Sequence, residues 1–202
     1  RLTTAKKKEI LLNNIFGVDI DAQAVEVTKL SLLLKVLEGE SSETIGSQLA
    51  LFQERVLPDL GHNIKCGNSL IGPDYYEGQQ LTMGFEGEEE RYRVNAFDWR
   101  GEFSDVFIHG GFDAVVGNPP YVVLSEDNFS PESLKYLSQY KVAKYKTDLF
   151  HLFIEKGIDV LRETGVLGFI TPSTWFTLQF SDKLREFVLK RSAIQELTLF
   201  EH

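Results

Sequence analysis

The chain has 202 residues, of which 43% are hydrophobic and 25% are charged, as in an ordinary globular domain with a substantial core. Its only cysteine, Cys66, excludes an internal disulfide and an all-cysteine zinc site, and is typical of a reducing cytoplasm. The sequence contains no apolar run long enough for a membrane span and no secretory signal, so no membrane partner is expected.

The formal net charge of −9 is unusual for a protein that binds nucleic-acid phosphates. However, the acidic and basic residues are segregated along the chain. Acidic residues concentrate between residues 86 and 105, and the basic residues that follow form two groups: Lys135, Lys141, Lys144 and Lys146, and then Lys183, Arg185, Lys190 and Arg191. Each group is either a solvated helix face or a phosphate-binding surface, and both interpretations stay open.

A strand, a tight turn and a helix are predicted near the start of the chain. Residues 14–20 form an apolar run typical of a buried strand, and apolar residues then recur at helical spacing over 22–37. Asp21 stands where a helix N-cap is expected, and Gly39 stands where the helix should stop. After a polar connection, a second strand is predicted at 64–67.

The remaining elements alternate between apolar strands and amphipathic helices. In order, they are a strand at 112–117 buried on both faces, a helix that starts at Ser130 and Pro131, a helix at 148–162, a strand at 165–170, a helix at 181–190 and a final strand at 194–200. Residues 75–111, which are acidic and Gly-rich, are interpreted as an insertion in which residues 92–97 could pair as a hairpin edge. The alternation predicts an α/β fold with a mostly parallel, doubly wound sheet.

The tetrad Asn118, Pro119, Pro120 and Tyr121 directly follows the strand predicted at 112–117. In parallel sheets, ligands bind beyond the carboxyl ends of the strands. Two consecutive prolines make a rigid, extended turn, and neither has a backbone N–H that would compete with the carbonyl oxygens beside it. The tetrad is therefore the most specific candidate for an active site in this sequence.

Such a turn suits a planar amino group with two N–H donors, such as that of adenine. The Asn118 side-chain oxygen and a neighbouring carbonyl oxygen accept both hydrogens, which draws the nitrogen lone pair out of conjugation and aims it at an electrophile. The Tyr121 ring offers a face on which a flipped base can stack. Its hydroxyl has no role in this interpretation, so Tyr121→Phe is expected to be nearly harmless. The alternative is an Asn-capped proline turn beside a core tyrosine.

Two further strand ends carry polar side chains that suit a nucleoside. Asp19 ends the first predicted strand, where a carboxylate can accept hydrogen bonds from both hydroxyls of a ribose. Asn68 follows the second strand and can bond the exocyclic amine of an adenine ring, with Ser69 and Leu70 beside it. The alternatives are a capping or solvated acid and an ordinary turn asparagine. A parallel sheet would place Asp19, Asn68 and Asn118 at the same edge.

Other chemically capable residues are assigned to structural roles. The histidines are scattered through the sequence, which predicts neither a metal site nor an acid–base dyad; they are His62, His109, His151 and His202. Cys66 and Phe153 are expected in the core, and the alternative for Phe153 is a contact with the adenine ring of a bound nucleoside. Trp175 and Phe176 follow the strand at 165–170 and either form part of a base-binding wall or pack a lid.

Four segments, in their order, resemble the gamma-class adenine-specific methyltransferases of restriction–modification systems. They are residues 14–21, 66–70, 112–121 and 165–176. The resemblance covers nearly the whole chain and implies a Rossmann-like fold, S-adenosylmethionine as cofactor and double-stranded DNA with a flipped adenine as substrate. The tetrad alone is shared with protein-glutamine and some RNA methyltransferases. Those activities are alternatives, as is a catalytically silent binding or scaffold module.

The resemblance also implies roles for individual residues. Asp19 would contact the cofactor ribose, and Ile20 would line the adenine pocket. Asn68 stands where the family usually has Asp and would contact the cofactor's adenine through the acceptor that it retains. The tetrad, from Asn118 to Tyr121, would grip the target adenine and stack on it.

One motif of the family is missing before Asp19. A glycine-rich turn that holds the methionine end of the cofactor should precede this residue by one helix, but Gly17 is the only glycine there. The first strand is therefore expected upstream. Residues 1–202 are interpreted as a partial catalytic domain that binds cofactor weakly and does not methylate DNA unaided. A later base-stacking motif, a target recognition domain and a fused or separate nuclease are expected outside it.

Overall fold

The computed structural model describes residues 2–38, 58–77, 85–144 and 147–200. The chain divides into two compact units, Arg1–Asn68 and Ser69–His202. Each unit is described by itself. Among the described residues, no helix is both long and apolar enough to cross a membrane.

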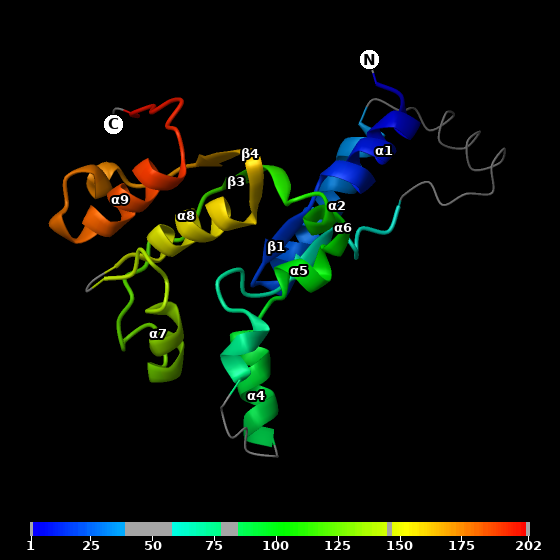
Figure 1. Cartoon of the computed structure of the whole chain (residues 1–202). Coiled ribbons are helices and arrows are strands. Elements are labelled where there is room, and N and C mark those ends of the chain that lie inside the picture. Colours follow the sequence, from blue (N-terminus) through cyan, green and yellow to red (C-terminus); the bar gives the residue numbers. More distant parts are fainter. Residues whose placement is uncertain (1, 39–57, 78–84, 145–146, 201–202) are drawn as a thin grey trace. The chain divides into compact units, whose positions relative to one another are not determined.

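The first unit contains the predicted strand, turn and helix (Figure 1). Its elements are α1 (Thr4–Asn14), β1 (Gly17–Asp19), α2 (Ala22–Leu37) and β2 (Ile64–Cys66). Strands β1 and β2 pair in parallel, with Asp19 opposite Cys66. The predicted N-cap is confirmed, because Asp21 Oδ1 accepts a hydrogen bond of 2.8 Å from the Gln23 amide. The predicted stop at Gly39 lies outside the described residues.

A buried asparagine joins the elements of the first unit. Asn63 precedes β2 and is only 4% exposed. Its Nδ2 donates to the carbonyl oxygens of Leu12 at 2.8 Å and Ile15 at 2.9 Å, at the end of α1. These carbonyls have no partner within the helix, so the amide satisfies them and fixes the end of α1 beside β2.

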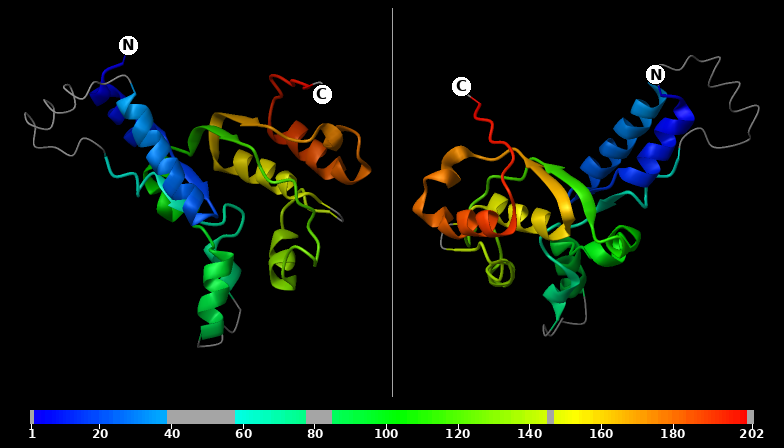
Figure 2. Two further views of the ribbon diagram at one scale, coloured as in Figure 1. Left: turned by 180° about the vertical axis from the view of Figure 1, so that it is seen from behind. Right: turned by 45° about the horizontal axis from the view of Figure 1, so that its top comes forward.

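The second unit combines a parallel strand pair with short helices (Figure 2). Its elements are η1 (Pro73–Tyr76), α4 (Phe85–Val94), α5 (Trp99–Glu102), α6 (Ser104–Ile108), β3 (Phe112–Gly117), α7 (Pro131–Leu137), α8 (Leu149–Val160), β4 (Leu161–Phe169), η2 (Ser173–Phe176), η3 (Gln179–Ser181) and α9 (Asp182–Arg191). Strands β3 and β4 pair in parallel, with Gly117 opposite Phe169. The α/β class and the parallel pairing are confirmed, but the described strands form two separate pairs.

Three finer predictions for the second unit are wrong. Strand β3 is not buried on both faces, because the Val116 side chain is 83% exposed and β4 is its only described neighbour. Residues 92–97 form no hairpin edge; their first part closes α4, and Asn95 follows it with a left-handed φ of 48°. Residues 194–200 form no strand and expose Phe200, because no described strand pairs with them.

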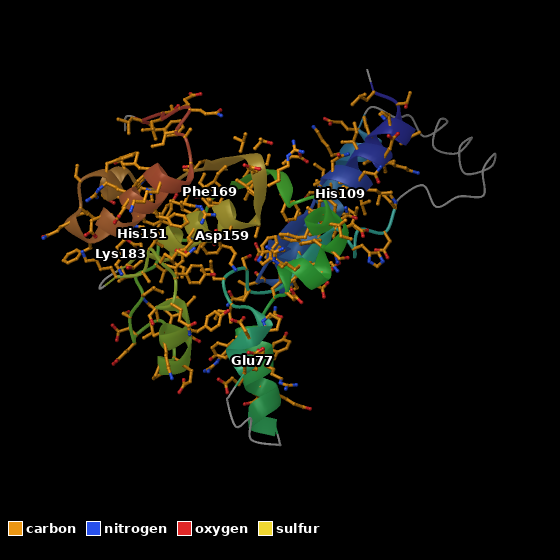
Figure 3. The ribbon with its side chains drawn as sticks, in the orientation of Figure 1. Glu77, His109, His151, Asp159, Phe169 and Lys183 are labelled. Atoms are coloured by element: carbon orange, nitrogen blue, oxygen red, sulfur yellow. The ribbon has the colours of Figure 1, made fainter. Side chains whose placement is uncertain are left out.

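Helix α8 packs closely on β4 because two glycines make room for one aromatic ring. A Cβ at Gly157 of α8 would lie 3.2 Å from Phe169 Cζ, and one at Gly117 of β3 would lie 3.0 Å from Phe169 Cε1. Phe169, labelled in Figure 3, therefore fills the space that the two missing side chains leave. This contact fixes the end of β3 relative to α8.

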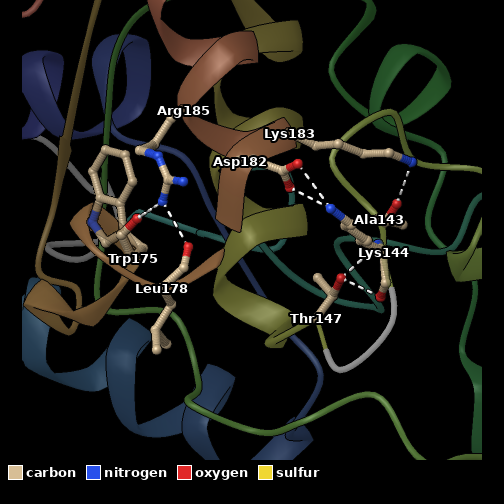
Figure 4. A network of polar contacts seen from close by, with 8 residues as sticks. All are labelled: Ala143, Lys144, Thr147, Trp175, Leu178, Asp182, Lys183 and Arg185. Carbon is tan, nitrogen blue, oxygen red and sulfur yellow. Dashed lines mark hydrogen bonds and ion pairs between the residues drawn. The ribbon is translucent and has the colours of Figure 1, made fainter. Parts of the chain in front are cut away.

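Polar contacts hold the segment between α7 and α8 against its neighbours. The buried carboxylate of Glu155, on α8, accepts hydrogen bonds from the amides of Lys141 at 3.2 Å and Val142 at 2.9 Å. Lys144 pairs with Asp182 of α9 at 2.8 Å (Figure 4). The pair of amide hydrogen bonds is the stronger restraint, because a buried carboxylate without its donors costs several kcal/mol, whereas an exposed ion pair contributes about 0–1 kcal/mol.

His151 is a buried base on α8, labelled in Figure 3. It is 3% exposed, and its ring stands edge-on to Phe150 with centroids 4.4 Å apart. Its Nε2 lies 3.4 Å from Ser181 Oγ, and its Nδ1 has no hydrogen-bond partner in the described part of the chain. Burial lowers the pKa of His151 to about 4, because the charged ring loses its hydration. The ring is therefore neutral at physiological pH.

The lowered pKa predicts that acid weakens this part of the fold. Between pH 6.5 and about 4 the unfolded chain binds a proton at His151 that the native chain does not. The opening free energy of α8 should thus be fully present above pH 6.5 and fall as the pH drops towards 4. Hydrogen–deuterium exchange of α8 peptides in the intact protein, corrected for intrinsic rates, measures it.

The control for this prediction is the exposed His109. His151→Gln should abolish most of the acid sensitivity of α8, whereas His109→Gln should leave it unchanged. If α8 of His151→Gln loses as much protection from exchange in acid as α8 of the wild type, the acid sensitivity of this helix comes from other groups.

Candidate active site

The predicted cofactor residues of the first unit lie at the carboxyl edge of the β1–β2 pair. Asp19 ends β1, and its carbonyl oxygen accepts a hydrogen bond of 2.8 Å from the Gly67 amide. This bond continues the parallel ladder past Cys66 and brings the turn that leads to Asn68 to the same edge as Asp19. The predicted placement of these two residues at one edge is confirmed, whereas their contact with a cofactor stays a prediction. Asn118 belongs to the other unit and lies at the carboxyl end of β3.

The Asp19 carboxylate is exposed beyond the strand end. Its Oδ1 accepts a hydrogen bond of 2.8 Å from the Asp21 amide, which orients the carboxyl group. The adjacent Ile20 side chain is 56% exposed, so a charged acceptor and an apolar surface stand side by side. The thiol of Cys66 donates to the Ile20 carbonyl oxygen at 3.5 Å. Cys66 is itself exposed, contrary to the expectation that it belongs to the core.

The residues after β2 differ in their accessibility. Asn68 and Ser69 are partly buried, and the Ser69 carbonyl oxygen accepts a hydrogen bond of 3.0 Å from Trp99 Nε1. Leu70 is only 3% exposed and belongs to the hydrophobic core, and its carbonyl oxygen accepts from Tyr140 Oη at 2.7 Å. The burial of Leu70 gives no support to a contact between its side chain and a ligand.

Backbone hydrogen bonds hold the tetrad from both ends. At its start, the Gly117 carbonyl oxygen accepts from the Ile170 amide at 3.2 Å, which extends the β3–β4 ladder by one step. At its end, the Val122 carbonyl oxygen accepts from the Leu149 amide at 2.8 Å, next to an antiparallel bridge between Val123 and Asp148. Because the two prolines donate nothing, the turn depends on these flanking bonds for its position.

Within the tetrad, Pro119 is buried whereas Asn118, Pro120 and Tyr121 are exposed. The tyrosine ring is 51% exposed, and it meets the buried ring of Phe150 at 90° with centroids 6.1 Å apart. An amide and an aromatic ring are therefore presented together at the carboxyl end of β3 on a rigid, well-packed base.

The structure assigns the Tyr121 hydroxyl two neighbours that the sequence did not predict. Its Oη lies 2.9 Å from Asn118 Oδ1 and 3.1 Å from the Ile170 carbonyl oxygen, and the single hydroxyl hydrogen is shared between these acceptors. The hydroxyl thus orients the Asn118 amide and connects the tetrad to the end of β4. The sequence predicts no partner for this hydroxyl, whereas the structure shows two; its effect on the reaction stays a prediction.

The aromatic residues beyond β4 belong mainly to the core. Trp175 is 8% exposed and stacks on Phe176 with centroids 4.3 Å apart. Arg185 Nη1 donates to the carbonyl oxygens of Trp175 at 2.7 Å and Leu178 at 2.8 Å, which ties η2 to α9 (Figure 4). Of the two interpretations, the packing role is favoured for Trp175. Phe153 packs against the same core, as predicted.

Within the described ranges, no three His, Cys, Asp or Glu side chains are arranged to hold a metal ion. His62 and His109 are exposed, and His151 is buried. His202 lies outside the described residues. The tetrad itself presents hydrogen-bond acceptors and an aromatic face.

Comparison with known proteins gives the family. The family model described as Eco57I restriction-modification methylase matches residues 13–202. The chain belongs to this family. The match covers both units of this restriction-modification methylase, so the strand ends that carry Asp19 and Asn118 both fall inside it.

The methylase chain is also similar to several curated proteins. It is 36% identical over 196 residues to the type II restriction enzyme and methyltransferase RM.Eco57I of Escherichia coli, which covers 96% of this chain and 17% of that protein. It is 22% identical to a putative enzyme of the same description, RM.MjaORFECS2P of Methanocaldococcus jannaschii, over 95% of this chain and 24% of that protein. A shorter match, 34% identical, covers 45% of this chain and 22% of the type II methyltransferase M.TthHB8I of Thermus thermophilus.

Proposed function

We propose that the chain is part of a site-specific DNA adenine methyltransferase, which transfers a methyl group from S-adenosylmethionine to the amino group of adenine in a restriction–modification system. The observation that carries this proposal is the tetrad at the carboxyl end of β3, where Asn118 and Tyr121 are exposed together. Membership of the restriction-modification methylase family supports DNA as the substrate. The proposal includes a Rossmann-like fold for the complete catalytic domain.

Asn118 would activate the target nitrogen through hydrogen bonding. Its Oδ1 and a carbonyl oxygen of the Pro119–Pro120 turn accept the two amino hydrogens of adenine, which localises the lone pair on the nitrogen. An amide oxygen has two lone pairs, so Asn118 Oδ1 can keep the Tyr121 hydroxyl while it accepts an adenine hydrogen. No general base is needed before the methyl group arrives, because the neutral amino nitrogen is the nucleophile; once methylated, the nitrogen releases one of its two protons to water.

Tyr121 would hold the base that has been turned out of the duplex. Half of its surface is exposed, and Phe150 supports the ring from the core. Base–aromatic stacking contributes about 1–3 kcal/mol, which offsets part of the unstacking cost of base flipping. The Tyr121 hydroxyl adds a positioning role, since it restrains the amide of Asn118.

The edge of the β1–β2 pair fits the nucleoside part of the cofactor. The exposed carboxylate of Asp19 suits two ribose hydroxyls, and the exposed Ile20 suits one face of an adenine ring. Asn68 would supply a further polar group at this edge, and Ser69, which begins the second unit, directly follows it in the chain. S-adenosylmethionine, when bound, supplies the electrophilic methyl group.

The partners of the complete protein follow from its relatives. RM.Eco57I is named as both restriction enzyme and methyltransferase, and the chain spans about a sixth of its length. We therefore expect double-stranded DNA as the substrate, with a nuclease and a target recognition domain in the same polypeptide or in a separate one. The protein-glutamine, RNA and scaffold alternatives would each give no methylated adenine in DNA.

Asn118→Ala tests the central step. It removes one of two acceptors on the amino group, and loss of a preorganised hydrogen bond of this kind lowers the rate about 100- to 1000-fold. The measurement is incorporation of a labelled methyl group into adenine of duplex DNA by the intact protein. Asn14→Ala, at the exposed end of α1, is the matched control and should retain activity. Full adenine methylation by Asn118→Ala would overturn the proposed function.

Tyr121→Phe and Tyr121→Ala separate the two roles of the tyrosine. The phenylalanine variant keeps the stacking face but frees the Asn118 amide to rotate, so kcat should fall several-fold while KM for DNA changes little. The alanine variant also loses about 1–3 kcal/mol of stacking, so KM should rise as well. Steady-state kinetics on duplex DNA distinguish these results. If kcat and KM are the same for Tyr121→Phe and the wild type, the hydroxyl has no role in the reaction.

Asp19→Asn tests the cofactor site separately from the tetrad. It keeps the acceptor for the Asp21 amide but loses the charge and one ribose acceptor. The Kd for S-adenosylmethionine should rise about 10- to 100-fold, as expected when a hydrogen bond to a charged group is weakened. Calorimetry on the intact protein gives the value. Asp21→Asn, which retains the helix cap, should bind as the wild type does.

A further inference from the structure

A basic groove lies on the second unit between α9 and the segment that joins α7 to α8. It has a volume of about 340 Å³. Its lining consists of four cationic side chains, one carboxylate and one aromatic ring: Lys141, Lys183, Lys190, Arg191, Glu186 and Phe187. This concentration of positive charge contrasts with the net charge of −9 of the whole chain. An anionic partner is therefore favoured in this groove.

The cations of α9 form a row along one helix face. Lys183 and Lys190 are seven residues apart, which is about 10.5 Å along the helix axis at 1.5 Å per residue. Phosphates of one DNA strand follow one another with a rise of about 3.4 Å along the duplex axis, so a duplex backbone presents more than one phosphate over the length of this row. A single phosphate ion would engage only part of this length.

Aromatic contacts hold two of the cations in place before any ligand binds. The Lys141 Nζ lies 5.9 Å from the centroid of the Phe187 ring, and the Arg191 guanidinium carbon lies 5.7 Å from it. The Phe187 ring is 8% exposed and packs into the hydrophobic core. Cations that already rest on a fixed ring lose less conformational freedom on binding than freely rotating ones.

The other two cations are also restrained without being neutralised completely. The Lys183 ammonium has three hydrogens and donates one to the Ala143 carbonyl oxygen at 2.8 Å, which orients the side chain across the groove (Figure 4). Lys190 pairs with Glu186 at 2.5 Å, an exposed contact that contributes about 0–1 kcal/mol. Glu186 is the carboxylate among the residues that line the groove, and a second carboxylate, Asp159, pairs with Arg191 at 3.5 Å.

We propose that this groove binds the phosphodiester backbone of duplex DNA and sets the position of the duplex on the second unit. The inference rests on the proposed function, because it assigns a contact surface for the same substrate. Lysine contacts with phosphates carry no sequence information, so the groove would contribute equally to cognate and unrelated duplexes. Selection of the DNA site would remain with other parts of the protein.

The test is the salt dependence of duplex binding by the intact protein. Each phosphate contact contributes about 0.9 to the slope of log affinity against log salt concentration. In Lys183→Gln/Lys190→Gln, the slope should become less steep by up to about 1.8. Binding at low salt should weaken by the same factor for a cognate duplex and an unrelated one.

Two control variants guard against a general loss of folding. Glu186→Gln removes the repulsive carboxylate and releases Lys190, so it should strengthen duplex binding, which misfolding cannot do. Lys35→Gln removes the same charge from an exposed site on α2 and should leave the slope unchanged. The unfolding temperature of every variant should stay close to that of the wild type.

The outcomes separate this inference from the proposed function. If the wild type methylates adenine in DNA but the double variant keeps its salt slope and Glu186→Gln binds no more tightly, the groove is not a DNA-binding surface. If the wild type neither binds duplex DNA nor methylates it, the proposed function fails and the groove assignment fails with it. A less steep slope in the double variant, with tighter binding by Glu186→Gln, supports the groove.

Discussion

The tetrad is held by hydrogen bonds with the residue that follows β4. Its two prolines have no amide hydrogens, so the middle of the turn cannot be fixed by backbone bonds that it donates. Instead, the Ile170 amide bonds the Gly117 carbonyl, and the Ile170 carbonyl lies within reach of the Tyr121 hydroxyl. One residue beyond β4 thus contacts both ends of the turn. Together with the bond between the Leu149 amide and the Val122 carbonyl oxygen, this residue sets the orientation of the Asn118 amide and the position of the aromatic face.

The elements that carry the candidate site could be predicted because each has a local signal. An apolar run followed by a double proline marks the end of β3, and an aspartate before an amphipathic stretch marks the start of α2. Each of these sequence patterns spans only a few consecutive residues, so it can be read without knowing the rest of the fold. The family resemblance added the order of the strand ends and assigned Asp19 and Asn118 to different ligands, which periodicity alone cannot do.

The features that escaped prediction depend on contacts between distant parts of the chain. Nothing near Glu155 in the sequence indicates that its carboxylate accepts two amides of the segment before α8. The exposure of Val116 and the lack of a strand at 194–200 have one cause, since an apolar run predicts a strand but not the neighbour that would cover or pair it. The sequence predicts the two groups of basic residues from which the groove is built. The contacts of Lys141 and Arg191 with the Phe187 ring are seen only in the structure.

The position of Phe169 between Gly117 and Gly157 has a consequence for how such a sequence can change over time. A methyl group added at Gly117 would lie 3.0 Å from the Phe169 ring, whereas one at Gly157 would lie 2.7 Å from Leu167 Cδ1 and 3.2 Å from the same ring. A smaller residue at 169 alone would therefore make room at Gly117 but not at Gly157. A larger residue at Gly157 requires both Leu167 and Phe169 to give way, so a helix position with no chemical role comes to restrict which residues can stand on the strand beside the tetrad.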